Sequence, residues 1–143
     1  MRRVFLFLLI GLICGCAFVS TMSAANRVSF RGLTPGVSTL GDTIRILGAP
    51  RSRISEKDYL ICKYRTMSVV IPHNSGRIEY IVIADPDFVD VNGFQLDSTY
   101  EEISEKLGLQ ASGNTVLDTA NGVLYIFDQD GYVTQIVYRN IAG

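Results

Sequence analysis

The sequence predicts an α+β fold of two tandem repeats, each a helix followed by three strands, with the helices packed on an antiparallel sheet. Two internal similarities predict this arrangement. Residues 69–83 align with residues 124–138, and both stretches have the pattern strand, polar turn with glycine, strand. Residues 38–48 align with residues 98–108, and both have the spacing of a short helix. One copy alone is too small to bury a stable core, so the two copies are expected to pack as one unit.

Each predicted helix carries an apolar stripe on one face, because its apolar residues recur every three or four positions. The stripe residues are Leu40, Ile44, Leu47, Tyr100, Ile103 and Leu107. Hydroxyl side chains that can cap the free N–H groups precede both stripes. These capping candidates are Ser38, Thr39, Ser98 and Thr99. Gly48 and Gly108 follow the stripes and are expected to end the helices in the left-handed conformation.

Three strands are expected after each helix. The first strand of each set covers residues 58–64 in one copy and residues 114–118 in the other. The remaining two strands flank a polar turn, and Gly76 and Gly131 provide the positive φ that such a turn often needs. The chain is thereby divided into five segments. They are a signal peptide (1–15), a tether (16–32), repeat 1 (33–84), an acidic linker (85–95) and repeat 2 (96–143).

The N-terminus has the pattern of a secretory signal, with Arg2 and Arg3 before an apolar run. The sequence LICGC at the end of this run resembles a bacterial lipoprotein signal. That resemblance implies cleavage before Cys16 and a lipid on Cys16, which would anchor the protein in the cell envelope, facing the periplasm or the exterior. Cleavage after Ala25 and a retained membrane anchor remain open alternatives. Cys62 has apolar neighbours and is expected to be a buried side chain, not a nucleophile.

The stretch LTPGVSTLGDTIRILGAP, with a turn glycine, a short helix and then Leu-Gly-Ala-Pro, resembles the opening of the SmpA/OmlA family. These small lipoproteins belong to the outer-membrane assembly machinery and share a fold with the tandem-repeat β-lactamase inhibitor proteins. The resemblance covers residues 33–83 best and residues 91–139 more loosely. The second copy departs from the motif, because Leu109 and Gln110 follow its glycine without a proline. Family members usually have one such unit, so the duplication favours the inhibitor-like architecture.

The charge of the chain is balanced overall, with 13 basic and 14 acidic residues, which is not the basic excess of a nucleic-acid-binding protein. The balance hides an asymmetry. Residues 27–80 hold nine basic and four acidic residues, a net charge of +5, whereas residues 81–143 hold two basic and ten acidic residues, a net charge of −8. Either the halves attract each other or their charges are simply solvated, or the surface is bipolar and steers a charged partner.

The sequence has no catalytic, zinc-binding or phosphate-binding pattern. His73, the single histidine, aligns with Asp128 in the second copy, so no catalytic role is expected for it. The linker offers oxygen ligands of the kind that calcium prefers, but it lacks EF-hand spacing, and its residues are also typical turn formers. These candidate ligands are Asp85, Asp87, Asp90 and Asn92. No cofactor is expected.

We therefore expect a cell-envelope lipoprotein that binds another envelope protein of unknown identity, without catalysis, in envelope or outer-membrane assembly. The alternative from another class is a secreted or tethered inhibitor of an extracytoplasmic hydrolase, and a small-ligand or calcium sensor is a third reading. Tyrosine and arginine are favoured at protein interfaces, although strand tyrosines are also common in half-buried packing. The candidate partner-binding residues are Arg51, Arg53, Tyr80 and Tyr132.

Overall fold

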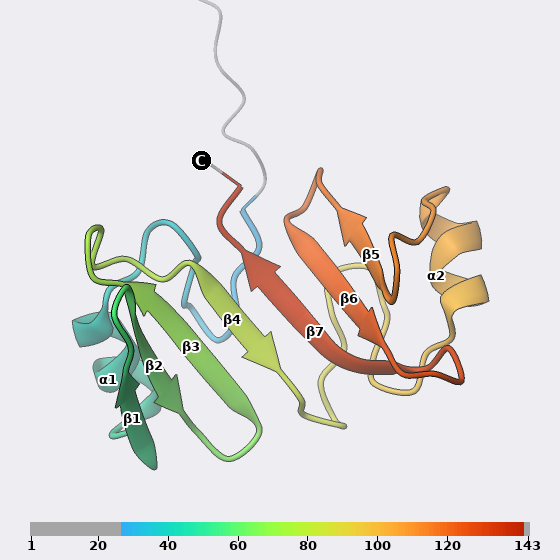
Figure 1. Ribbon diagram of the computed structural model, residues 1–143. Coiled ribbons are helices and arrows are strands. Elements are labelled where there is room, and N and C mark those ends of the chain that lie inside the picture. Colours follow the sequence, from blue (N-terminus) through green and yellow to red (C-terminus); the bar gives the residue numbers. More distant parts are fainter. Residues whose placement is uncertain (1–26, 142–143) are drawn as a thin grey trace, which may run out of the picture.

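The computed structural model describes residues 27–141, which form two short helices and a seven-stranded sheet (Figure 1). In chain order the elements are α1 (Leu40–Leu47), β1 (Ser52–Ser55), β2 (Tyr59–Lys63), β3 (Met67–Pro72), β4 (Tyr80–Ile83), α2 (Tyr100–Leu107), β5 (Thr115–Asp118), β6 (Val123–Phe127) and β7 (Val133–Arg139). The predicted signal peptide, Cys16 and the cleavage site after Ala25 lie outside the described residues. Within residues 27–141, no helix is long and apolar enough to cross a membrane.

All seven strands form one antiparallel sheet in the order β1-β2-β3-β4-β7-β6-β5. The predicted fold class, two helix-plus-three-strand repeats, is therefore wrong. Four strands follow α1, and the pairing of β4 with β7 joins the strands of both halves into a single sheet. This pairing satisfies the backbone groups of two strands that would otherwise be exposed edges. The missed strand β1 has one half-buried apolar residue, Ile54, so it lacks the alternation that predicts a strand.

The internal similarity of the sequence nevertheless appears as matching local contacts. The N–H of Ile78 donates to the carbonyl of Ser38 at 2.8 Å, and the N–H of Val133 donates to the carbonyl of Ser98 at 2.9 Å. These four residues are equivalent in the two self-alignments. In both halves, the contact ties the chain just before the helix to the start of a central strand, two residues before β4 in one half and at the first residue of β7 in the other.

Both helices begin and end where the sequence predicts. Thr39 and Thr99 are the N-caps, and each forms a reciprocal capping box with the acidic residue three positions later. Gly108 ends α2 in the left-handed conformation, as predicted. Gly48 also has a positive φ of 79°, but its ψ of −168° is extended, so α1 does not end in the predicted left-handed conformation.

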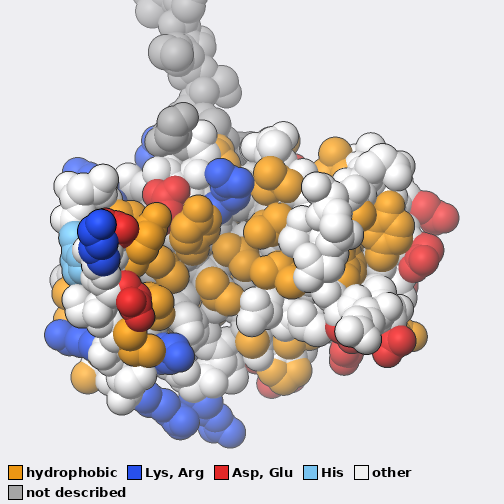
Figure 2. Space-filling view, viewed as in Figure 1, with side chains coloured by type: hydrophobic (Ala, Val, Ile, Leu, Met, Phe, Trp, Pro, Cys, Tyr) orange, Lys and Arg blue, Asp and Glu red, His pale blue; other side chains and the backbone are white. Residues whose placement is uncertain are grey.

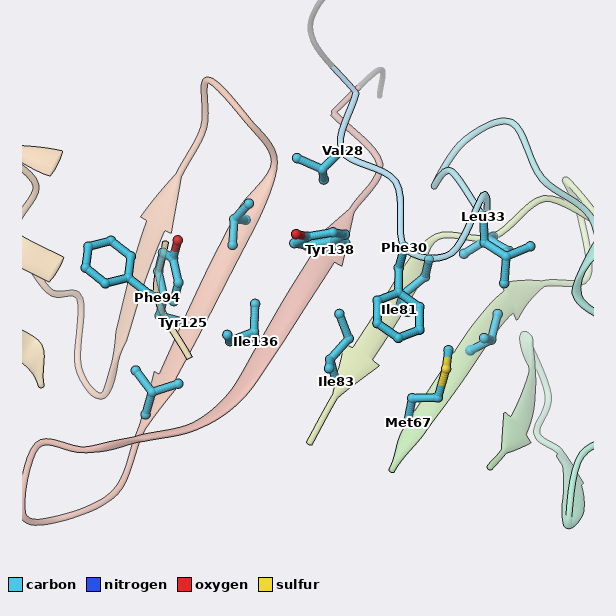
Figure 3. Packing of buried hydrophobic residues seen from close by; sticks show 14 of the residues in the cluster. Val28, Phe30, Leu33, Met67, Ile81, Ile83, Phe94, Tyr125, Ile136 and Tyr138 are labelled. Atoms are coloured by element: carbon cyan, nitrogen blue, oxygen red, sulfur yellow. The ribbon is translucent and has the colours of Figure 1, made fainter. Parts of the chain in front are cut away.

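One face of the sheet, which we call the closed face, carries the hydrophobic core (Figure 3). Register places one continuous row of buried side chains across five strands. The row consists of Cys62, Val69, Ile81, Tyr138 and Val123. Five of the six predicted stripe residues pack in or against this core, namely Leu40, Leu47, Tyr100, Ile103 and Leu107. Ile44 is not among the core residues, and the buried side chain of α1 is that of Thr43 instead. Val28 and Phe30, within the predicted tether, are also buried in the core, so the folded part begins before Leu33.

Candidate functional site

The opposite face of the sheet, which we call the open face, also carries mainly apolar side chains at its centre. Strand register sets these side chains in two adjoining rows that together cross the sheet from β1 to β5, and we call them the apolar band. The band consists of Ile54, Ile61, Val70, Tyr80, Val82, Val137, Leu124 and Leu117. In the view of Figure 1 the helices lie behind or beside the strands, and Figure 2 shows hydrophobic side chains over the middle of this face.

An apolar open face is unusual for an antiparallel sheet. Such a sheet normally has one apolar face on the core and one polar face in water. Here most side chains of the band are half-buried by their neighbours alone, and only Val137 is fully buried. A contiguous apolar surface of this kind typically marks a place where another molecule binds. The band is therefore the candidate functional site.

The sequence contained a signal for the band that the repeat-based prediction missed. The strands around the centre of the sheet hold consecutive apolar residues, such as YIVI in β4 and VLYIF in β6, instead of alternating apolar and polar residues. Consecutive apolar residues on a strand place apolar side chains on both faces of the sheet. That pattern indicates a sheet whose two faces are both suited to burial.

A hollow of about 320 Å³ lies at one margin of the band. Leu117 of the band lines it together with Gly122, Arg139 and Ile141. Arg139 lies beside Tyr80 in the β4–β7 register and so belongs to the open face as well. The hollow gives the open face a recess into which a side chain of a partner could fit, and its lining includes one cationic side chain, Arg139, and one anionic side chain, Glu79.

Opposite charges flank the band at its two ends. Exposed basic residues gather around β1 and β2, and exposed acidic residues gather on α2 and the β6–β7 turn (Figure 2). Within residues 27–141, one ion pair joins the two halves, between Arg31 and Asp85 at 3.7 Å. The charges of the halves are thus mainly not paired with each other, and the surface is bipolar.

The structure does not bring the four predicted partner-binding residues together. Arg53 lies on the edge strand β1 and shares the side of the sheet with Cys62, and exposed Arg51 precedes it. Tyr80 lies three strands away on the open face, and exposed Tyr132 lies in the β6–β7 turn. Of the four, only Tyr80 belongs to the apolar band.

His73 forms hydrogen bonds that join two turns, and Cys62 is buried. The Nε2 atom of His73 donates to the carbonyl of Glu56 at 3.0 Å, and its backbone N–H donates to the carbonyl of Asp58 at 2.9 Å. These bonds tie the β3–β4 connection to the β1–β2 turn. Cys62 is buried, as predicted, and burial raises the pKa of its thiol, which disfavours the reactive thiolate.

The acidic linker packs against the sheet, and its central carboxylate, that of Asp90, is buried. Asp90 accepts hydrogen bonds from the N–H groups of Asn92 and Phe94 and from the hydroxyl of Tyr125. The side-chain amide of Asn92 continues the network to Asp118 at 3.0 Å. Burial by itself would raise the pKa of Asp118, but hydrogen bonds from Asn121 and Asn92 outweigh it and lower that pKa.

The same network bears on the calcium alternative. Asp85 and Asp90 use carboxylate oxygens to accept backbone N–H groups of the linker itself, as turn-forming aspartates do. Among residues 27–141, no three histidine, cysteine or acidic side chains are placed to hold a metal ion together. The linker geometry is that of hydrogen-bonded turns fastened to the sheet.

Comparisons with known proteins inform the fold alone. No family model and no curated protein matches the chain. An extracellular protein containing an SCP domain from Bacillus anthracis str. Ames is similar over 80% of this chain and 48% of its own, with a TM-score of 0.55 and 12% identity. The present chain thus spans about half of that protein. A DUF4309 family protein, YjgB from Bacillus subtilis subsp. subtilis str. 168, is similar over 80% of this chain and 87% of its own, with a TM-score of 0.51 and 14% identity.

Proposed function

We propose that this protein is a non-catalytic binding module of the cell envelope, anchored through a lipid on Cys16, and that its open face binds a protein. The apolar band carries the proposal. Each Å² of apolar surface that is removed from water favours association by about 25 cal/mol. The band offers aliphatic side chains on a sheet for such burial. A rigid surface loses little conformational entropy on binding, which adds to affinity.

Four further observations support a binding role at the envelope. The N-terminal pattern is that of an exported lipoprotein, and one structural neighbour is an extracellular protein. His73 and Asp90 carry titratable side chains, and both side chains form hydrogen bonds with the backbone of the protein itself. The resemblance of residues 33–83 to SmpA/OmlA lipoproteins suggests envelope or outer-membrane assembly as the setting.

Site-specific photo-crosslinking in intact cells tests the proposal. A photo-crosslinking amino acid in place of Leu124 lies on the open face, whereas one in place of Val91, which is 56% exposed in the linker, is a control away from the band. We expect protein capture from position 124 and much less from position 91. Capture of an extracytoplasmic hydrolase would identify the inhibitor alternative. No protein captured from position 124 would refute a protein-binding open face.

A further inference from the structure

We infer that the occupant of the open face is a second copy of this chain, packed sheet against sheet with its halves reversed. The inference rests on the proposed function, because it names the partner of the same face. It follows from two features of that face: the band is continuous across the sheet, and the charges at its two ends are opposite. Each feature restricts the partner, and a second copy satisfies both.

The band matches itself under a two-fold rotation. It crosses the full width of the sheet, from Ile54 in β1 to Leu117 in β5, and its centre lies on β4, the fourth of the seven strands, which carries Tyr80 and Val82 of the band. A two-fold axis that lies between two facing copies and crosses the band at this centre places one band along the other. Aliphatic side chains of two sheets can then interdigitate, as they do in β-sandwiches, where the sheets pack about 10 Å apart.

The two-fold axis could run across the band or along it, and the charges favour the axis across the band. With the axis across the band, the basic β1–β2 end of one copy faces the acidic end, near β5 and α2, of the other. The net charges of the facing halves are +5 for residues 27–80 and −8 for residues 81–143, and they attract. An axis along the band would instead place like ends opposite each other, which is strongly unfavourable.

The flanking charges are free to act between copies. The basic set consists of Arg51, Arg53 and Lys63, and the acidic set of Glu101, Glu105 and Asp130. All six side chains are exposed, and within residues 27–141 none of them forms an ion pair or a side-chain hydrogen bond. Lys63 follows Ile61 by two residues in β2 and so lies on the open face itself, whereas Arg53 projects to the closed-face side of the edge strand β1 and adds to the positive charge of this end at longer range. Reversing these charges therefore removes no contact that holds the monomer together.

The first experiment uses two differently tagged full-length copies in the same cells, both with a photo-crosslinking amino acid in place of Leu124. We expect a crosslinked species with twice the monomer mass that carries both tags. A crosslink only to a different protein would overturn this inference while supporting the proposed function. The absence of any crosslink would overturn both.

The second experiment tests the reversed orientation with two charge variants. One variant combines Arg51→Glu, Arg53→Glu and Lys63→Glu, and the other combines Glu101→Lys, Glu105→Lys and Asp130→Lys. Each variant alone should lose dimer crosslinking by about tenfold, which corresponds to roughly 1.4 kcal/mol of repulsion. The two variants expressed together should crosslink to each other, because every facing pair of ends is again opposite in charge. Such a rescue also shows that both variants fold. Unchanged crosslinking of either variant alone would overturn the proposed packing.

Discussion

The hydroxyl of Tyr125 in β6 donates a hydrogen bond to the buried carboxylate of Asp90 in the linker. The ring of Phe94 meets the ring of Tyr125 edge to face, with centroids 5.6 Å apart, at the other end of the same linker segment. A polar and an apolar contact of one tyrosine therefore fasten the segment that joins the two halves onto the closed face.

Tyr125→Phe should destabilise the fold by about 1–3 kcal/mol, because it keeps the ring contact and removes a hydrogen bond to a buried charged group. Urea unfolding followed by circular dichroism measures the change. Tyr132→Phe is a matched control, because Tyr132 is 45% exposed, and it should change the unfolding free energy little. Equal effects of the two substitutions would mean that the bond to Asp90 does not stabilise the linker.

The stability should fall in alkali because two tyrosines are buried as neutral phenols. Burial raises the pKa of Tyr138 to about 12, and burial followed by the bond to Asp90 raises the pKa of Tyr125 further above the ordinary 10.0. These phenols ionise more readily in the unfolded chain than in the folded protein. Their contribution to the free energy of unfolding is therefore complete below pH 10 and is lost as the pH rises toward 12. An absorbance titration at the phenolate band should show these two groups ionising only together with unfolding.

The stability should also fall in acid, in part through Asp118. The pKa of this carboxyl is lowered in the fold from an ordinary value of 3.8, so its contribution is present above pH 3.8. That contribution is lost as the pH falls through the lower pKa of the folded state. Asp118→Asn should flatten the decline of the unfolding free energy below pH 4. An unchanged acid dependence in this variant would show that Asp118 does not contribute to it.

Gly122→Ala should destabilise the protein more than Gly113→Ala. Both glycines have a positive φ, +71° and +62°, so both substitutions incur the left-handed penalty of about 1–2 kcal/mol. A Cβ at position 122 would also lie 2.9 Å from the carbonyl oxygen of Arg139 and collide with Ile141, whereas one at position 113 meets open space. Thermal unfolding of the two variants isolates the collision, and equal melting temperatures would contradict it.

Cys16→Ser should move the protein from the membrane fraction to the soluble fraction and abolish labelling by a fatty-acid analogue, because the substitution removes the thiol that is proposed to carry the lipid. Cys14→Ser is the control and should keep the label. If the Cys16 variant is labelled as strongly as the unchanged chain, lipidation at this position is excluded.

The sequence predicted well the features that depend on short-range interactions. Thr39 and Thr99 begin helices because a capping hydroxyl and an acidic residue three positions later satisfy free N–H groups locally. Cys62 is buried because its strand neighbours are apolar. Capping, turns and hydrophobic periodicity all act within a few residues, so they can be recognised in a single sequence.

The prediction failed where contacts are formed between distant residues. Strand β1 exists because Arg53 and its neighbours pair with β2, not because SRIS has a strand pattern. Asp90 lies among residues that the sequence identified as typical turn formers, and its burial depends on Tyr125, 35 residues later in the chain. A polar residue can be buried when a distant partner forms its hydrogen bonds, and its own sequence context does not reveal that partner.

The sequence by itself determined the helices, most of the strands and the opposite charges of the two halves. The tertiary structure decided that the halves share one sheet, because β4 and β7 pair through residues such as Ile81 and Tyr138, 57 positions apart. That pairing aligns Val82 with Val137 and so completes the apolar band across both halves. Strand pairing at this separation depends on which edges remain unpaired after local folding, and a linear pattern of residues does not encode that choice.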